Sequence, residues 1–173
     1  PWLLSLLKQQ LEIKGFLQYD GQFYNLHPVV RGVVTGRMAS EEKQNYGQKV
    51  VDYFSQKAPI FYEEVESLEE LSDVINLVTT LQKIGKFQEA VDLFRGDLCY
   101  SLLFNLEAYY EVLEIIQPFF NKSRAKPVKS IEEEDSYYLI NELALVFFRF
   151  GNLHESIPLI LVNLEYYLIL LIF

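Results

Sequence analysis

The sequence carries the same pattern twice, at residues 71–94 and at residues 137–160, and this repetition limits the possible folds more than any other feature. In each stretch, apolar residues recur at steps of three and four on both sides of a central glycine. Such spacing places the apolar side chains on one face of a helix. A glycine tolerates the left-handed backbone with which many helices end, so each stretch predicts two short helices joined by a tight turn. The two glycines, Gly85 and Gly151, are 66 residues apart, which is close to two periods of about 33–34 residues.

The side chains expected to face inward share this spacing in both stretches. They are Val74, Leu77, Val78, Leu81, Phe87, Ala90, Val91 and Phe94 in the first stretch, and Ile140, Leu143, Ala144, Phe147, Leu153, Ser156, Leu159 and Ile160 in the second. A period of about 33–34 residues is typical of tetratricopeptide (TPR) repeats. We therefore expect an all-α fold, a TPR-like α-solenoid in which helix pairs form a right-handed superhelix. The unit between the two stretches is irregular, because Glu107 stands where a glycine is usual.

Composition narrows the class of protein. Half of the residues are hydrophobic and 15% are aromatic, which indicates a folded chain. The net charge is −9, with the acidic excess after residue 38. Because an acidic surface repels phosphate backbones, we expect no nucleic acid as the main partner. Cys99 is the only cysteine, which excludes an intrachain disulfide and a Cys₂His₂ zinc site and fits a cytoplasmic protein.

The first 37 residues follow a different pattern. Residues 2–14 place leucines on one helical stripe, which predicts a helix. Residues 16–19 and 22–26 are short β-type runs joined by Asp20-Gly21, a dipeptide typical of hairpin turns. Pro28 then opens a second helix, at a first-turn position where its missing N–H costs nothing. A helix, a two-stranded wing and another helix look like the second half of a winged-helix domain.

The run QFYNLHPVVR at 22–31 resembles the YxLHPLVR end of the winged-helix domain in STAND ATPases, the NB-ARC and NACHT type of signalling switch. In that family the winged helix follows a nucleotide-binding domain and precedes a sensor array, often made of TPR repeats. The resemblance implies a winged-helix remnant at 1–37 and irregular TPR-like repeats at 38–173. It also implies that His27, in an intact STAND protein, would reach the phosphate of bound ADP. The alternative role for His27 is to cap the helix that follows it.

No motif predicts an enzyme. The chain lacks a G-x-x-x-x-G-K-[ST] phosphate loop, so we expect no cofactor, and it has no G-x-S-x-G run. The two histidines, His27 and His154, have no companion at metal-ligand spacing. The four acids at 132–135 point around a helix start instead of converging, so a solvated cap is favoured over a metal site. We therefore expect neither catalytic nor metal-binding residues.

Two serines mark expected helix starts. Ser67 and Ser130 each precede a glutamate by three residues, which is the spacing of a capping box. We expect one helix to start at each position.

A binding surface remains as the expected function. In TPR proteins the first helix of each pair lines a concave groove. By that register the groove residues are Ser72, Ile75, Thr79, Gln82 and Lys83 in the first repeat, Ser101, Phe104 and Asn105 in the middle unit, and Tyr138, Asn141, Leu145, Phe148 and Arg149 in the last. The alternative is that these side chains only pack against neighbouring helices.

The leading hypothesis is a non-enzymatic protein–protein interaction module for a protein or peptide ligand, similar to the sensor arm of a STAND ATPase. One alternative is a free-standing TPR scaffold. Another is a DNA-binding regulator that uses the winged helix, although its recognition helix at 2–14 is mostly apolar.

The end of the chain is unusually apolar. Residues 164–173 read LEYYLILLIF, with no charge after Glu165. This run is too short to span a bilayer, and Pro158 and Asn163 interrupt any longer window, so we expect no membrane association. Exposed side chains of this size would form a patch that soluble monomers avoid. We therefore expect a homodimer that forms through 153–173.

Overall fold

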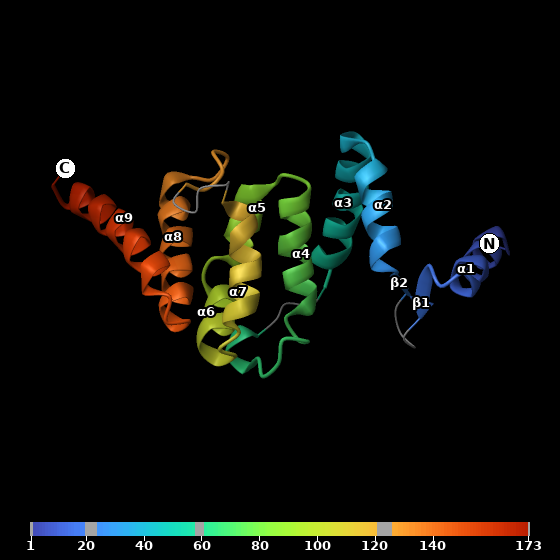
Figure 1. Cartoon of the computed structure of the whole chain (residues 1–173), viewed down its shortest axis with the longest axis horizontal. Coiled ribbons are helices and arrows are strands. Elements are labelled where there is room, and N and C mark those ends of the chain that lie inside the picture. Colours follow the sequence, from blue (N-terminus) through green and yellow to red (C-terminus); the bar gives the residue numbers. More distant parts are fainter. Residues whose placement is uncertain (1, 20–23, 58–60, 121–125, 173) are drawn as a thin grey trace. The chain divides into compact units, whose positions relative to one another are not determined.

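The computed structural model describes residues 2–19, 24–57, 61–120 and 126–172. The described chain is mostly helical, so the predicted all-α class is confirmed. It divides into two compact units, Pro1–Tyr46 and Gly47–Phe173. Helix α3 (Ser40–Ser55) contains the boundary between the units (Figure 1).

The first unit contains two helices and a hairpin before α3. Helix α1 spans Trp2–Ile13 and helix α2 spans Pro28–Arg37. Strands β1 (Leu17–Tyr19) and β2 (Tyr24–Leu26) pair antiparallel between them. The predicted strands are therefore present, and the expected Asp20-Gly21 turn lies outside the described residues.

Aromatic and backbone contacts hold this hairpin. The rings of Tyr19 and Tyr24 stack across the strands with their centroids 4.6 Å apart. The Nζ atom of Lys8, on α1, lies 3.8 Å from the centre of the Tyr24 ring. The N–H of His27 donates to the carbonyl oxygen of Phe16 at 2.9 Å. A hairpin this short is marginal alone, and these contacts stabilise it against α1.

The second unit is a series of helices joined by short turns. After α3 come η1 (Tyr62–Glu64), α4 (Ser72–Lys83), α5 (Phe87–Phe94), α6 (Asp97–Tyr100), η2 (Ser101–Asn105), α7 (Tyr109–Ile116), η3 (Gln117–Phe119), α8 (Glu133–Arg149) and α9 (Leu153–Ile172). Elements η1 and η3 are 3₁₀ turns, and η2 continues α6 as a π-helical turn. Helix α7 contacts both α4 and α8, and α9 packs along α8 (Figure 1). Both repeated stretches therefore form a helix, a turn and a second helix.

The turns inside three of the helix pairs adopt a left-handed backbone. Gly85 has φ +82° and Gly151 has φ +71°, as their positions predict. Glu107 has φ +51°, and no other described non-glycine residue has a positive φ. The middle unit therefore turns in the same way without a glycine, at the expense of backbone strain.

The predicted apolar faces form the core of the second unit. The expected inward side chains that are buried are Val74, Leu77, Val78, Leu81, Ala90, Val91, Phe94, Ile140, Leu143, Ala144, Phe147, Ser156 and Leu159. Phe87 is half-buried against this core. The prediction is wrong for Leu153 and Ile160, which are exposed on α9. Their helix turns one face toward α8 and leaves the other open.

Both predicted capping boxes are wrong. Helix α4 begins five residues after Ser67, whose hydroxyl instead donates to the Glu70 carboxylate at 2.7 Å. Helix α8 begins after Glu132, and Ser130 does not cap it. The N–H of Glu132 donates to Oε1 of Gln88, on α5, at 2.8 Å. A side chain from another helix therefore replaces the local cap that the sequence predicts for α8.

Candidate functional site

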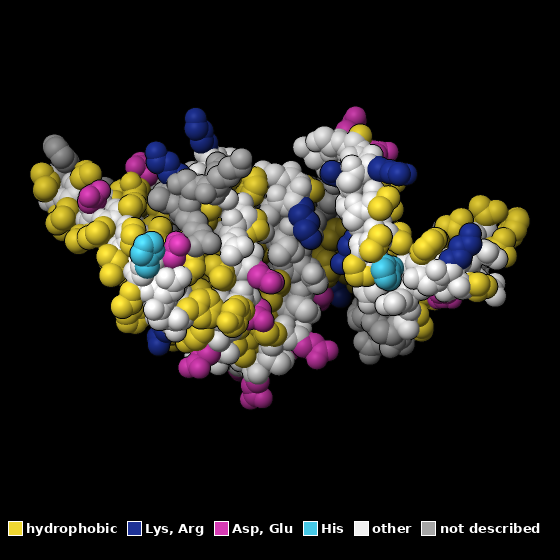
Figure 2. All heavy atoms as spheres, viewed as in Figure 1, with side chains coloured by type: hydrophobic (Ala, Val, Ile, Leu, Met, Phe, Trp, Pro, Cys, Tyr) yellow, Lys and Arg dark blue, Asp and Glu magenta, His cyan; other side chains and the backbone are white. Residues whose placement is uncertain are grey.

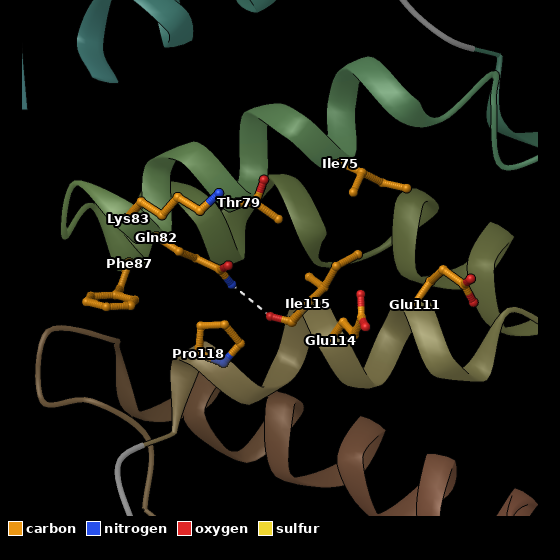
Figure 3. A pocket seen from close by; sticks show the side chains of 9 residues that line it. All are labelled: Ile75, Thr79, Gln82, Lys83, Phe87, Glu111, Glu114, Ile115 and Pro118. Atoms are coloured by element: carbon orange, nitrogen blue, oxygen red, sulfur yellow. Dashed lines mark hydrogen bonds between the residues drawn. The ribbon is translucent and has the colours of Figure 1, made fainter. Parts of the chain in front are cut away.

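A groove of about 370 Å³ lies between α4 and α7 (Figure 3). Its lining residues are Ile75, Thr79, Gln82, Lys83, Phe87, Glu111, Glu114, Ile115 and Pro118. Four of the five groove residues predicted for the first repeat belong to this lining. The fifth, Ser72, is exposed at the start of α4. The opposite wall comes from α7, which is the second helix of the middle unit and not the first helix that the TPR register indicates.

Gln82 joins the two walls. Its side chain is buried although it is polar, and its Nε2 atom donates to the carbonyl oxygen of Ile115 at 2.8 Å (Figure 3). Ile115 lies in the last turn of α7, where carbonyl groups have no partner within the helix. The bond satisfies two buried polar groups and fixes the spacing of the walls.

The two walls of the groove differ in charge. Lys83 extends from α4, whereas Glu111 and Glu114 lie one helical turn apart on α7 (Figure 3). Within the described part of the chain, none of these three side chains forms an ion pair. Ile75 and Phe87, both half-buried, supply apolar surface between the charges. This lining suits an apolar side chain next to a charged group.

The groove residues predicted for the middle unit do not join the α4–α7 groove. Ser101 and Asn105 both donate to the carbonyl oxygen of Tyr62, at 2.8 and 3.2 Å, and line a separate cavity. Phe104 is exposed, and its ring centre lies 5.0 Å from that of Tyr100. Two of the three predicted residues therefore support the η1 turn.

The residues predicted for the last repeat also lie apart from the α4–α7 groove. The hydroxyl of Tyr138 accepts from the N–H of Gly96 at 3.5 Å. The guanidinium of Arg149 lies 5.9 Å from the centre of the Tyr109 ring. The other members are Asn141, which lies beside Asn163 of α9, the half-buried Leu145 and the exposed Phe148.

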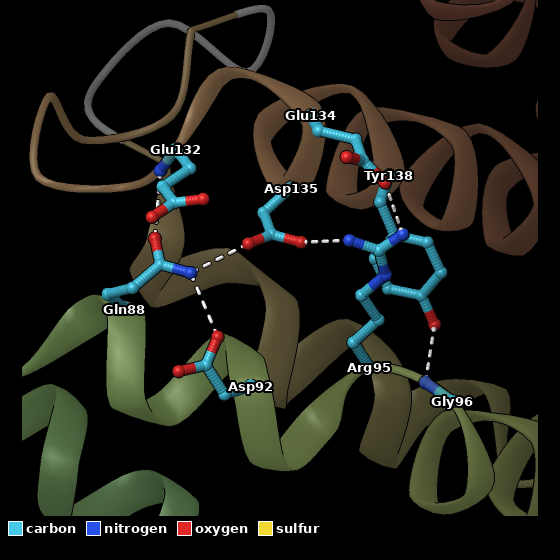
Figure 4. A network of polar contacts seen from close by, with 8 residues as sticks. All are labelled: Gln88, Asp92, Arg95, Gly96, Glu132, Glu134, Asp135 and Tyr138. Atoms are coloured by element: carbon cyan, nitrogen blue, oxygen red, sulfur yellow. Dashed lines mark hydrogen bonds and ion pairs between the residues drawn. The ribbon is translucent and has the colours of Figure 1, made fainter.

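A polar network fastens α5 to the start of α8 (Figure 4). The Arg95 guanidinium binds Asp135 through Nη1 at 2.5 Å and Glu134 through Nη2 at 2.6 Å, and these bonds raise the pKa of Arg95. Gln88 donates to the second oxygen of Asp135 at 2.6 Å. Charge-assisted bonds to a buried carboxylate are among the stronger polar contacts in proteins. The network therefore holds two helix pairs together.

The sequence did not predict this network. The acidic run was expected to be a solvated helix cap, and that prediction is wrong for Asp135, which is 5% exposed. Arg95 is 40 residues away in the sequence, so no local spacing could identify it as the partner.

Three titratable side chains meet where α6 packs on α8. Burial, together with the charge of Glu142, raises the pKa of the Cys99 thiol to about 12. Burial also raises the pKa values of Tyr138 and of Glu142, although Nδ2 of Asn141 donates to the Glu142 carboxylate at 3.2 Å and opposes the second shift. Cys99 is therefore a protonated, buried thiol at neutral pH and not an activated nucleophile.

His27 caps α2. Its Nδ1 atom accepts from the N–H of Val29 at 3.3 Å, and Pro28 occupies the first helical position. This is the capping role that was the alternative to a phosphate contact. A contact with ADP in an intact STAND protein stays a prediction.

The chain matches no protein-family model, no curated protein and no solved structure. None of the helices in the described ranges is both long and apolar enough to cross a membrane. The same residues contain no group of three or more His, Cys, Asp or Glu side chains placed to hold a metal ion.

Proposed function

We propose that this chain is a non-enzymatic protein-interaction module that binds a segment of a protein partner in the α4–α7 groove. The observation that carries this proposal is that four residues selected by the repeat register line one open groove with an apolar interior and a charged rim. The volume of about 370 Å³ lies within the range of roughly 300–1,000 Å³ that is common for ligand pockets.

The residues that line the groove also indicate the chemistry of the ligand. Ile75 and Phe87 can bury an apolar anchor side chain, because both are half-buried and leave apolar surface in the groove. Glu111 and Glu114 on α7 favour a lysine or arginine next to that anchor. The ligand class is therefore a peptide segment that has a large apolar residue close to a basic one.

We propose that this module is the sensor arm of a STAND ATPase. Support comes from two helix pairs whose turns lie 66 residues apart and from the hairpin that stands between α1 and α2. A right-handed TPR-like solenoid at 38–173 and a winged-helix remnant at 1–37 are parts of this proposal. No observation favours a free-standing scaffold.

DNA binding by the first unit has no support in α1. This helix exposes Trp2 and Leu3, and its Lys8 lies over the Tyr24 ring. We expect no mobility shift of a generic DNA duplex at low salt, because non-specific binding depends on basic side chains facing phosphates. A shift would favour the DNA-binding alternative.

Selection from a phage library of random twelve-residue peptides tests the groove. We expect the chain to enrich peptides with an apolar anchor near lysine or arginine. Thr79→Arg, which fills the groove and adds positive charge, should abolish their binding. Asn76→Arg is the matched control, because Asn76 is exposed on α4 outside the groove.

Circular dichroism must show that both variants keep the helical signal of the parent chain. Absence of any enriched peptide, or equal binding by the Thr79→Arg variant, would contradict the proposed groove.

We also propose that the chain self-associates through α9. Along this helix Leu153, Ile157, Ile160, Leu164, Leu168 and Leu171 recur at steps of three and four, and all are exposed. Figure 2 shows hydrophobic side chains over most of the visible surface of α9. Ten large apolar side chains of α9 are 47% or more exposed, and monomeric soluble proteins rarely expose contiguous apolar surface on this scale.

A second copy fits this face because the same stripe can pack against itself about a two-fold axis. Size exclusion with light scattering should show a dimer at micromolar concentration. The double variant Ile157→Glu and Leu164→Glu should be a monomer with its helical signal intact. Phe61→Glu, which removes an exposed large apolar side chain outside α9, should leave the dimer unchanged. A monomeric parent chain would refute self-association.

A further inference from the structure

A second cavity, of about 480 Å³, lies where η1 meets α6 and η2. Its lining residues are Tyr62, Glu63, Asp97, Tyr100, Ser101 and Asn105. It shares no lining residue with the α4–α7 groove.

Hydrogen bonds fix one wall of this cavity. The hydroxyl of Ser101 and the side-chain amide of Asn105 both donate to the carbonyl oxygen of Tyr62, at 2.8 and 3.2 Å. Ser101 is 1% exposed, so its bond is shielded from water. Because these bonds join residues that are 39 and 43 positions apart in the sequence, they hold η1 against η2 in a defined place.

The cavity combines negative charge with aromatic rings. Glu63 and Asp97 supply two carboxylates, and in the described ranges neither forms an ion pair. Burial and then the charge of Asp97 raise the pKa of Tyr62, so the phenol lies near that carboxylate. The ring of Tyr100 is exposed and is braced by Phe104.

These groups together favour a cationic ligand. The face of a phenol ring attracts a cation within about 6 Å, and a carboxylate binds a guanidinium through paired hydrogen bonds. A planar guanidinium can do both at once, whereas an ammonium acts as a point charge. A metal ion fits less well, because no described group of three or more carboxylate, thiol or imidazole side chains surrounds the cavity.

We propose that this cavity binds an arginine side chain of a partner protein, with Asp97 and Glu63 bonding the guanidinium and with Tyr62 and Tyr100 contacting its plane. This contact is separate from the α4–α7 groove and does not depend on it. It requires only that the partner present an exposed arginine.

Nuclear magnetic resonance titration of the full chain with Nα-acetyl-arginine methylamide tests the proposal. We expect saturable shifts in the signals of Tyr62, Tyr100 and the Asn105 side chain. The matching citrulline derivative, which has the same shape but no charge, should produce none of them. The lysine derivative should bind more weakly by a few-fold.

Variants then assign the site. Asp97→Asn, which keeps the shape and removes one charge, should weaken arginine binding by about fivefold. Tyr100→Leu is a second, independent variant and should also weaken it. Glu64→Gln is the matched control, because Glu64 is on the same 3₁₀ turn but does not line the cavity. Glu111→Gln, in the α4–α7 groove, should leave unchanged the affinity measured from the signals of Tyr62, Tyr100 and Asn105, because Glu111 does not line this cavity.

Three results would overturn the proposal. The first is an equal response to citrulline, and the second is arginine binding that Asp97→Asn and Tyr100→Leu both leave unchanged. The third is a loss of arginine binding in the Glu111→Gln variant, which would place the basic side chain in the other groove.

Discussion

The helix pairs α4–α5 and α8–α9 carry the same apolar register 66 residues apart, yet they bury different parts of it. Val91 and Phe94 on α5 are fully buried, whereas their counterparts Ile157 and Ile160 on α9 are 52% and 47% exposed. The ring of Phe119, from η3, lies 6.4 Å from that of Phe94 and helps to cover α5. No described residue takes that place against α9. Apolar spacing therefore predicts which face of a helix can be buried, but not whether another element covers it.

The same two pairs also differ at Gln82 and Phe148, which are again 66 residues apart. The glutamine is buried and the phenylalanine is 55% exposed, which is the reverse of what hydropathy predicts. Gln82 is buried because the carbonyl oxygen of Ile115 accepts its hydrogen bond. A polar partner on α7 thus decides the burial of this position, and α8 has no equivalent partner at Phe148 among the described residues.

Replacing one large apolar side chain in each helix pair should give the largest difference in stability between the two pairs. Phe94→Ala should lower the free energy of unfolding by about 3–5 kcal/mol, because it opens a cavity in the packed core. Ile160→Ala should cost less than about 1 kcal/mol in dilute protein, since its side chain is half exposed. Urea denaturation measures both values.

The same pair of variants reports on α9. A cost for Ile160→Ala that grows with protein concentration would support the proposed dimer. If Ile160→Ala lowered the free energy of unfolding of the monomer as much as Phe94→Ala does, α9 would be covered within one chain. The two helix pairs would then not differ in burial.

A substitution at Glu142 should change the stability of the chain by a smaller amount, and that amount should depend on pH. Its counterpart in α4, Asn76, is exposed, whereas Glu142 is buried and its pKa is raised. Because the pKa of Glu142 is higher in the folded chain than in the unfolded chain, the protonated side chain favours folding. This contribution to the free energy of unfolding is present in full below the unfolded-state pKa of about 4.3. It is lost as the pH rises through the folded-state pKa.

At neutral pH the buried carboxylate is therefore a cost, and Glu142→Gln should stabilise the chain by roughly 1–2 kcal/mol. The gain should vanish below about pH 4, where the parent side chain is neutral as well. Thermal melts between acidic and neutral pH measure it, with Glu165→Gln on the surface of α9 as the control. A gain that does not change with pH would show that ionisation of Glu142 is not its source.

Local signals in the sequence predicted much of this fold. The helices and the left-handed turns at Gly85 and Gly151 each depend on residues within one or two turns of each other. The cap at His27 is equally local, and the sequence left it open as an alternative to a phosphate contact. The buried faces of α4 and α5 follow from spacing alone, because the elements on both sides of them are present.

The candidate sites were harder to predict because their walls come from distant parts of the chain. Sequence reasoning selected Ile75 and Thr79 for the α4–α7 groove, but the opposite wall comes from α7, with Glu111 and Glu114. It selected Ser101 and Asn105 of the second cavity but missed its carboxylates on η1 and α6, which have no shared spacing with the repeat. The capping box at Ser130 failed for the same reason, since a side chain from α5 replaces it.

A substitution in the turn at Glu107 should give the smallest change in stability. It also extends the comparison of helix pairs to the middle unit. Its φ of +51° is a conformation that costs a residue with a Cβ atom about 1–2 kcal/mol, and that glycine adopts freely. Glu107→Gly should therefore stabilise the chain by roughly 0.5–1 kcal/mol, after the added entropy of the unfolded glycine is subtracted. Gly85→Ala is the mirrored control: a Cβ at Gly85 would meet no atom within 4 Å, so its expected loss of about 1 kcal/mol comes from the backbone alone. Equilibrium denaturation of both variants measures these changes, and a loss of stability in Glu107→Gly would mean that the glutamate side chain contributes more to the turn than its strained backbone removes.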